Sequence, residues 1–330
     1  MEEGKRVLSI QSHVVSGYCG NKAATFPLQL LGFDVDTVNT VEFSNHTGYP
    51  TLGGHRLAED QYNELFAGLE RNGLLDYTYL LTGYIGTAEG LRAIIEFVKK
   101  MRASSPNMLF LCDPVMGDEG RFYVSEEVVP IYRDLLKYSD ITTPNQFEAE
   151  LLTGVKITDL ASAREAIDKL HDIGIKYVVI SSMPFPPDEP HIPHPPLPGN
   201  ANRVLYCVGS ELIQESPRIT KQFVVPFPAY GGYFVGTGDV FSALLIARLE
   251  EALAHGVAEG LSVACEKVIG SLGGIVQRTL EYQKQWLDKL ESDESDLAKA
   301  QRVRRCELRI IQSRADIEHP SCTFPAATLG

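Results

Sequence analysis

Residues 234–245 read Phe-Val-Gly-Thr-Gly-Asp-Val-Phe-Ser-Ala-Leu-Leu. Gly236 and Gly238 flank the hydroxyl of Thr237, and Asp239 precedes an apolar segment with helical spacing. Glycines permit a tight turn close to a ligand, and a helix that begins here would direct its free N–H groups at an anion. The Asp239 carboxylate would then be placed to take a proton from an attacking hydroxyl. The same residues also fit a common Gly-rich turn in which Asp239 is only a helix N-cap.

Outward from this stretch, short β-rich runs alternate with longer amphipathic runs. This alternation predicts βαβ units, and hence an α/β protein with a mostly parallel central sheet between two layers of helices. Polar clusters follow several of the strands, and in such folds ligands bind at the carboxyl ends of the strands. We expect strands over residues 6–11, 34–40, 77–82, 108–112, 141–142, 177–181 and 204–208. We expect helices over residues 23–31, 59–72, 88–103, 126–138, 146–152, 162–172, 239–254 and 261–286.

Composition excludes several classes of protein. The chain has 330 residues, of which 44% are hydrophobic and 22% charged, as expected for a globular protein with a substantial core. Its net charge of −13 argues against a nucleic-acid partner or an anionic membrane surface. No apolar run approaches the roughly 20 residues of a membrane span. The six cysteines are widely spaced and no signal peptide is visible, so we expect reduced thiols and a cytoplasmic location.

Two segments interrupt the alternation within what we expect to be a single domain over residues 1–330. Residues 183–200 hold eight prolines and predict an extended surface insertion, in which His191 and His194 are either solvated or a metal pair. Residues 287–305 are charged and predict a linker or solvated helix. Residues 307–312 then predict a last strand that returns to the sheet.

Two acidic loops accompany the glycine turn. Asp113 and Asp118 follow an apolar strand and suit Mg²⁺, although a polar turn with solvated aspartates fits them too. Asn145 and Glu148 would share one face of a helix, where they could serve a metal site or form only a capping box. The chain lacks the P-loop and the Gly-x-Gly-x-x-Gly dinucleotide motif.

Characteristic sequence blocks run through nearly the whole chain, at residues 7–13, 17–18, 20–21, 26–29, 43–49, 81–84, 112–118, 143–150, 236–239, 308–309 and 311–313. Together these blocks resemble the pyridoxal kinase family of the ribokinase-like superfamily. The Gly-Thr-Gly-Asp motif is common to that superfamily, whereas the blocks around residues 9–13 and 43–49 are specific to the pyridoxal branch. The resemblance implies the ribokinase-like three-layer fold and ATP-dependent phosphorylation of the 5′-hydroxymethyl group of pyridoxal, pyridoxine and pyridoxamine. It also implies a homodimer.

The resemblance also implies a role for each matching residue. Asp239 would be the catalytic base, and Gly236, Thr237 and Gly238 would form the anion hole. The vitamer would contact Ser12, Thr47, Phe43, Tyr84 and, as a weaker candidate that also fits a structural role, His46. The nucleotide would lie near Asp113, Asp118, Tyr123, Asn145, Glu148, Ser181, Ser182, Tyr230, Gly231, Gly232, Thr237 and Gly238. Mg²⁺, or Zn²⁺ in its place, would be held by Asp118 and Glu148, and K⁺ or Na⁺ by Asp113, Thr143 and Ser181.

Two other functions remain open at this point. A hydroxymethylpyrimidine kinase of the same superfamily would also phosphorylate a small hydroxymethyl heterocycle. A vitamin-binding protein without catalysis would need no base, so the presence of Asp239 argues against it. The chain departs from the family pattern in its short flap, residues 119–122, and in Cys19, where an aliphatic residue is expected.

Overall fold

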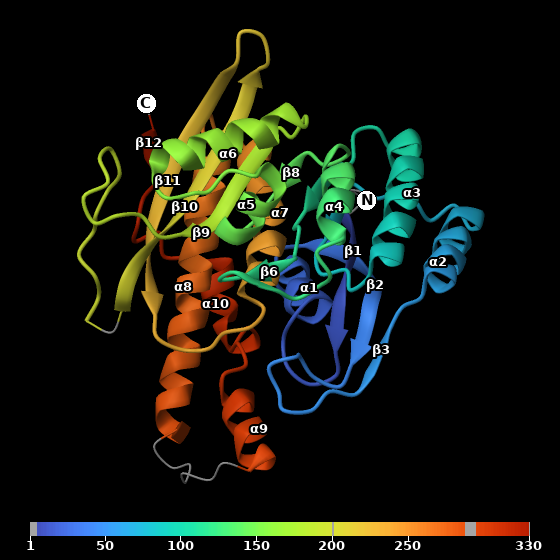
Figure 1. The fold of residues 1–330 in the computed structure, drawn as a ribbon, viewed down its shortest axis with the longest axis horizontal. Helices are drawn as coiled ribbons and strands as arrows, with labels where there is room; N and C mark the ends of the chain where they lie inside the picture. The colour runs from blue at the N-terminus through green and yellow to red at the C-terminus, as the bar shows by residue number, and fades with distance from the viewer. Residues whose placement is uncertain (1–4, 200, 288–294, 330) are drawn as a thin grey trace.

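The structure is a computed structural model that describes residues 5–199, 201–287 and 295–329 (Figure 1). The strands are β1 (Lys5–Val14), β2 (Phe33–Phe43), β3 (Gly54–Arg56), β4 (Tyr79–Thr82), β5 (Leu109–Cys112), β6 (Gly117–Asp118), β7 (Arg121–Phe122), β8 (Ile141–Thr142), β9 (Tyr177–Met183), β10 (Ala201–Gln214), β11 (Ile219–Tyr230) and β12 (Ala327–Leu329). The helices are α1 (Asn21–Leu30), α2 (Glu59–Arg71), α3 (Ala88–Ser104), α4 (Val128–Leu136), α5 (Gln146–Thr153), α6 (Leu160–Asp172), α7 (Thr237–Ala254), α8 (Gly260–Leu287), α9 (Asp296–Arg305), the 3₁₀ helix η1 (Ile311–Ser313) and α10 (Arg314–Glu318).

A ten-stranded sheet forms the centre of the molecule, in the order β12-β11-β10-β9-β8-β5-β4-β1-β2-β3. The six strands from β9 to β2 are parallel to one another, whereas β10, β11, β12 and β3 are antiparallel additions at the two ends. The parallel part arises because the connection from each of these six strands to the next one along the chain contains at least one helix. The prediction of a mostly parallel α/β sheet is confirmed.

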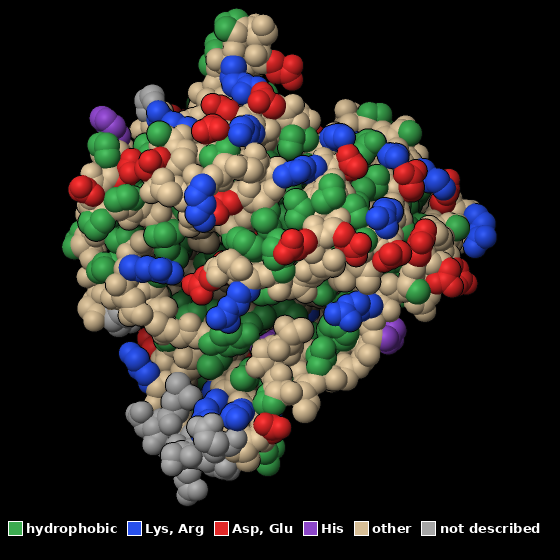
Figure 2. All heavy atoms as spheres, in the orientation of Figure 1, with side chains coloured by type: hydrophobic (Ala, Val, Ile, Leu, Met, Phe, Trp, Pro, Cys, Tyr) green, Lys and Arg blue, Asp and Glu red, His purple; other side chains and the backbone are tan. Residues whose placement is uncertain are grey.

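Helices cover both faces of this sheet, which gives three layers. One apolar core lies between the sheet and helices α2 to α6, and the other between the sheet and α1, α7, α8 and α10. Neighbouring residues of one strand enter opposite cores: Val7 packs into the second core and Leu8 into the first. Figure 2 shows acidic, basic and hydrophobic side chains interspersed across one face of the molecule. None of the described helices is long and apolar enough to cross a membrane.

The C-terminal part of the sheet differs from the sequence prediction. The expected strand over residues 307–312 is wrong, because residues 311–313 form the 3₁₀ helix η1 and β12 occupies the sheet edge instead. Leu308 and Ile310 are fully buried against the helical layer, so their alternation reflects packing rather than strand pairing. Strand β11 was missed because it contains Pro226 and Pro228, which lie beyond the part of β11 that pairs with β12.

The two irregular segments lie near the predicted positions. Residues 184–199 contain neither helix nor strand, but Met183 belongs to β9, so the Pro-rich segment begins one residue later than predicted. His194 bonds the Glu189 carbonyl through Nε2 and the Tyr206 hydroxyl through Nδ1. No group of three or more metal-ligating side chains occurs in the described part of the chain. Of the charged segment, residues 288–294 lie outside the described residues, and α9 is a helix without buried side chains.

Candidate active site

A cavity of about 1670 Å³ opens at the carboxyl ends of the parallel strands. Ser12, Asp113, Thr143 and Ser181 line it from the ends of β1, β5, β8 and β9, and Tyr84 lines it just after β4. The sequence places these residues in separate segments, and the parallel sheet gathers them because its carboxyl ends share one edge. The cavity also contains the glycine turn at the start of α7.

The glycine turn begins α7 at Gly236. Gly236 is the N-cap residue with a φ of 90°, in the left-handed region that favours glycine. A side chain there would place its Cβ 2.3 Å from the Tyr18 carbonyl oxygen, so only glycine fits. Asp239 is therefore the third residue of the helix, and the interpretation of Asp239 as a mere N-cap is wrong. The N–H groups of the first turn and the positive end of the helix dipole suit an anion at this position.

Asp239 is half-buried in the cavity wall. Its Oδ2 accepts a hydrogen bond of 2.7 Å from the backbone N–H of Gly20. Burial raises the pKa of Asp239, and the Gly20 hydrogen bond opposes that rise. A carboxylate that is partly desolvated but still ionisable is suited to accept a proton from an alcohol.

A hydrogen-bonded chain of side chains extends from Asp113. Asp113 is 4% exposed, and its Oδ2 accepts a bond of 2.9 Å from the Ser242 hydroxyl. The Ser242 oxygen in turn lies 2.9 Å from the Thr143 oxygen. Burial, and then the negative charges of Glu148 and Asp239, raise the pKa of Asp113. Sequence reasoning missed Ser242, because a serine in the buried face of α7 looks like a small core residue.

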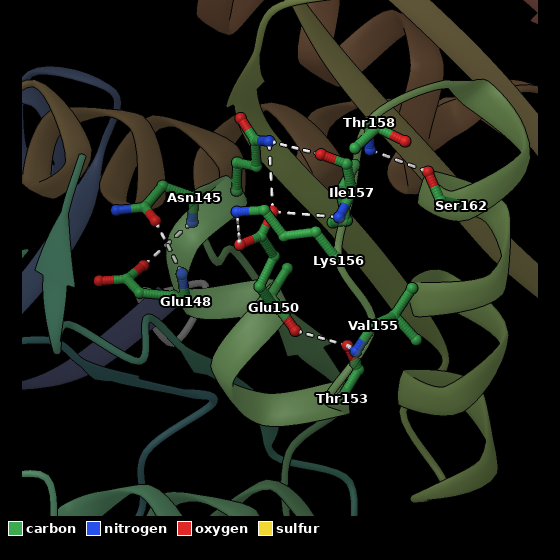
Figure 3. A network of polar contacts seen from close by, with 11 residues as sticks. Asn145, Glu148, Glu150, Thr153, Val155, Lys156, Ile157, Thr158 and Ser162 are labelled. Carbon is green, nitrogen blue, oxygen red and sulfur yellow. Dashed lines mark hydrogen bonds and ion pairs between the residues drawn. The ribbon is translucent and has the colours of Figure 1, made fainter. Parts of the chain in front are cut away.

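Glu148 is almost completely buried at the start of α5 (Figure 3). Its Oε1 accepts from the N–H groups of Met116 (2.9 Å) and Gly117 (3.4 Å), and its Oε2 from the N–H of Asn145 (3.0 Å). Oδ1 of Asn145 in turn accepts a bond of 2.9 Å from the N–H of Glu148, which completes the capping box that the sequence left open. Burial nevertheless raises the pKa of Glu148 to about 8, against the effect of these hydrogen bonds.

Asp118 and Tyr123 belong to the short hairpin β6–β7 that borders the cavity. Asp118 is exposed, and its Oδ1 accepts a bond of 2.8 Å from the N–H of Glu119. Tyr123 is 57% exposed, and its N–H donates a bond of 2.8 Å to the Met116 carbonyl, which fixes the base of the hairpin. The flap that the resemblance implies falls on this hairpin, and its closure over a ligand stays a prediction.

Apolar side chains form another part of the cavity wall. Phe43 is buried in a small cluster with Val14, Cys19 and Val41, and Tyr84 packs against this cluster. Every one of these residues lines the cavity, so a flat ring would meet apolar surface on this side. Thr47 is exposed at the cavity, where its hydroxyl is free to meet a ligand.

His46 also lines the cavity, but both of its ring nitrogens have protein partners. Its Nδ1 accepts from the N–H of Gly48 at 3.1 Å, and its Nε2 lies 3.2 Å from Oε1 of Glu307. This geometry favours the structural interpretation of His46 over a direct contact with a ligand. Glu307 was given no role from the sequence, although it directly precedes the matching block at residues 308–309.

The remaining nucleotide candidates divide into two groups. Ser182, Tyr230 and Gly232 line the cavity. Gly231 is not among the residues that line the cavity, and a Cβ there would lie 2.7 Å from Nδ2 of Asn202, so its contact with the nucleotide stays a prediction. The sequence analysis missed one further wall, formed by the small residues of α8 and the loop before β12: Gly270, Gly273, Gly274 and residues 321–324.

The acidic residues fit a cation site that acts through water and phosphate oxygens. A carboxylate has about four acceptor positions, and three backbone N–H groups already use three of those of Glu148. Asp118 keeps acceptor positions that protein groups do not fill. Besides burial, the negative charges of Glu148 and Asp239 raise the pKa of Asp113, and a bound cation would reduce this repulsion. Mg²⁺ keeps several waters when it binds to protein, which suits this arrangement.

Comparisons with known proteins give the family of the chain. Residues 75–263 match a family model described as phosphomethylpyrimidine kinase. Over its full length the chain is 40% identical to pyridoxal kinase of Bos taurus, with 100% of each chain covered. It is 41% identical to pyridoxal kinase of Arabidopsis thaliana, covering 97% of this chain and 94% of the relative. The chain belongs to the pyridoxal kinase family.

A solved structure agrees with this assignment. Pyridoxal kinase from Leishmania donovani, in complex with ADP and pyridoxamine, is 39% identical and has a TM-score of 0.81 over 99% of this chain and 100% of that one. The predicted ribokinase-like fold and the resemblance stated from the sequence are therefore confirmed. The full-length relatives also separate the pyridoxal branch from the pyrimidine kinases, which the family model alone does not.

Proposed function

We propose that this kinase transfers the γ-phosphoryl group of ATP to the 5′-hydroxymethyl group of pyridoxal, pyridoxine and pyridoxamine, giving the 5′-phosphates. The observation that carries this proposal is the pairing of Asp239 with the glycine turn at the start of α7. A base for an alcohol and a helix N-terminus for an anion lie side by side in one cavity. ADP and pyridoxamine occupy the related Leishmania donovani enzyme.

In this mechanism Asp239 accepts the proton of the hydroxymethyl group as the hydroxymethyl oxygen attacks the γ-phosphorus. The bond between the γ-phosphorus and the β–γ bridging oxygen breaks, and ADP leaves. Gly236, Thr237 and Gly238 stabilise the negative charge of the transferred phosphoryl group through N–H groups and the helix dipole. The Gly20 N–H holds the Asp239 carboxylate in place during this step. The nucleotide lies along the wall that contains Ser182, Tyr230 and Gly232 and beneath the Tyr123 flap.

Asp118 would hold Mg²⁺, or Zn²⁺ in its place, with Glu148 accepting from a water of the ion. The ion would neutralise charge on the phosphates of ATP. Asp113, Thr143 and Ser181 would hold K⁺ or Na⁺ at the ends of β5, β8 and β9. Burial and the nearby charges of Glu148 and Asp239 raise the pKa of Asp113, and a cation held beside its carboxyl group would favour the ionised form.

The vitamer ring would lie between Phe43 and Tyr84, with Ser12 and Thr47 at its polar edge. The apolar cluster around Phe43 supports this placement, because it offers a face to a flat heterocycle and little to a sugar. We also infer a cytoplasmic homodimer. Six free cysteines, four of them buried, support a reducing compartment, and the dimer rests on the family resemblance.

A coupled kinase assay with Mg-ATP tests the proposed function. Pyridoxal, pyridoxine and pyridoxamine should be phosphorylated, and ribose and adenosine should be inert. Hydroxymethylpyrimidine separates the second candidate, because a kinase of that branch would use it in preference to pyridoxal. Preferential turnover of the pyrimidine or of a sugar would overturn the proposed vitamer specificity.

A further inference from the structure

The side chain of Glu307 is 11% exposed and lies between two loops at the cavity. Its Oε2 accepts a bond of 2.9 Å from the backbone N–H of Tyr18. Its Oε1 accepts from the Tyr49 hydroxyl at 2.9 Å and lies 3.2 Å from Nε2 of His46. One carboxylate from the C-terminal segment thus binds the loop after β1 and the loop after β2.

The Tyr18 loop connects Glu307 directly to the catalytic groups. The N–H of Tyr18 bonds Glu307, while its carbonyl oxygen lies against Gly236, the N-cap of α7. Two residues later, the N–H of Gly20 bonds Asp239. A shift of this loop would therefore change the position of Gly236 and the position of the Asp239 carboxylate. Cys19, between these two contacts, lines the cavity.

The loop after β2 is held through His46. Because Nδ1 of His46 accepts from the N–H of Gly48, Nε2 carries the hydrogen and donates it to Glu307. Thr47 lies between His46 and Gly48 in the chain, so the hydrogen bond from Gly48 to the His46 ring fixes the backbone on both sides of Thr47. Tyr49 contacts Glu307 but does not line the cavity.

The close packing around Glu307 leaves little freedom. Gly17 has a φ of 102°, and a Cβ there would lie 2.3 Å from Oε1 of Glu307. The next residue, Leu308, is fully buried in the core under α7 and α8, which anchors the carboxylate from below. Glu307 therefore has one well-defined position from which it sets the positions of both loops.

We propose that Glu307 is a positioning residue for vitamer binding, which holds the Tyr18 and His46 loops at the spacing that the vitamer requires. This inference rests on the proposed function, because the vitamer is the ligand that these loops would contact. Glu307 itself does not line the cavity, so its effect on binding would pass through Tyr18 and His46.

The test compares steady-state kinetics of the wild type with those of Glu307→Gln and Tyr49→Phe. Gln keeps the shape of Glu, but its NH₂ group cannot accept a hydrogen bond and would face one of the donors that now bond the carboxylate. The variant therefore loses about one charge-assisted hydrogen bond. We expect the KM for pyridoxal to rise about 10-fold in Glu307→Gln and about 3-fold in Tyr49→Phe. The KM for ATP should stay within 2-fold of the wild-type value in both variants.

Glu250→Gln is the matched control. Glu250 also accepts from a tyrosine hydroxyl, that of Tyr79, and pairs with Lys5 far from the cavity. The Glu250→Gln variant should leave the KM for pyridoxal and the KM for ATP unchanged. A purely structural role for Glu307 predicts lower thermal stability with the KM for pyridoxal unchanged, or equal changes for both substrates, and either result would overturn the proposal.

Tyr49→Phe decides the matter if Glu307→Gln fails to fold, since it keeps the carboxylate and removes only one donor. A KM for pyridoxal within experimental error of the wild type in that variant would then overturn the inference. In the double variant, the KM for pyridoxal should rise by less than the product of the two single increases, because both substitutions act on the contacts of one carboxylate. Failure of the proposed function is seen separately, as absence of pyridoxal turnover by the wild type.

Discussion

Replacement of Asp239 by Asn tests the proposed base with little disturbance of the structure. Asn has the same shape, and its Oδ1 can accept the hydrogen bond that the Gly20 N–H now gives to Oδ2 at 2.7 Å. The loop after β1 and the glycine turn should therefore stay in place. The substituted side chain can no longer accept the proton of the substrate hydroxyl.

The expected loss follows from the contribution of a positioned base. Such a base contributes about 10²- to 10⁴-fold, which corresponds to about 2.7 to 5.4 kcal/mol of transition-state stabilisation. We expect kcat to fall by this factor, while the KM values for pyridoxal and ATP change by less than about 3-fold, because ground-state contacts are kept. Burial raises the pKa of Asp239, so wild-type kcat should fall as the pH is lowered through that raised value. The Asn variant should lack this dependence.

A coupled assay at saturating ATP, repeated across pH, measures these quantities. Asp159→Asn is a matched control, since Asp159 also accepts from a backbone N–H, that of Ser162 at 2.8 Å, but caps the distant helix α6. The control should retain wild-type kcat. An Asp239→Asn enzyme with kcat within 5-fold of the wild type would refute the assignment of Asp239 as the base.

Four further substitutions test other parts of the site. Asp118→Ala should raise the Mg²⁺ concentration for half-maximal rate several-fold, with pyridoxal binding in the absence of nucleotide unchanged in a titration; equal losses of both would indicate a structural carboxylate. Ser12→Ala and Thr47→Val should each reduce kcat/KM for pyridoxal by about 0.5–1.5 kcal/mol, and an unchanged kcat/KM would remove that residue from the vitamer site. The pKa of Glu148 is raised from 4.5 to about 8, so the folded state binds its proton more tightly than the unfolded chain does, and its contribution to stability should fall as the pH rises across that range. Thermal unfolding of the ligand-free enzyme should therefore show a smaller fall in Tm between pH 5 and 8 for Glu148→Gln than for the wild type, and identical slopes would contradict this.

Much of the fold was predictable because the local signals were strong. Alternating β-rich and amphipathic runs located the parallel strands and the main helices, and the glycine turn before Asp239 located the start of α7. The elements that were missed carry weak local signals. Strand β11 contains two prolines, which are tolerated because the neighbouring strand β12 is short and does not pair with that part of β11. Apolar and polar residues alternate around Leu308 because this segment packs on helices.

The motifs predicted the family, which the comparisons confirm, and they proposed the residues for its chemistry, because the glycine turn, the acidic loops and the blocks around Ser12 and Thr47 are contiguous in the sequence. How these motifs are held together depends on contacts between distant segments. Glu307 lies 258 residues after Tyr49 and 289 after Tyr18, and no local pattern relates such distant positions. The folding of the C-terminal segment back onto the loops at the cavity creates these contacts, because the burial of Leu308 under α7 and α8 brings the neighbouring carboxylate to the ends of the strands.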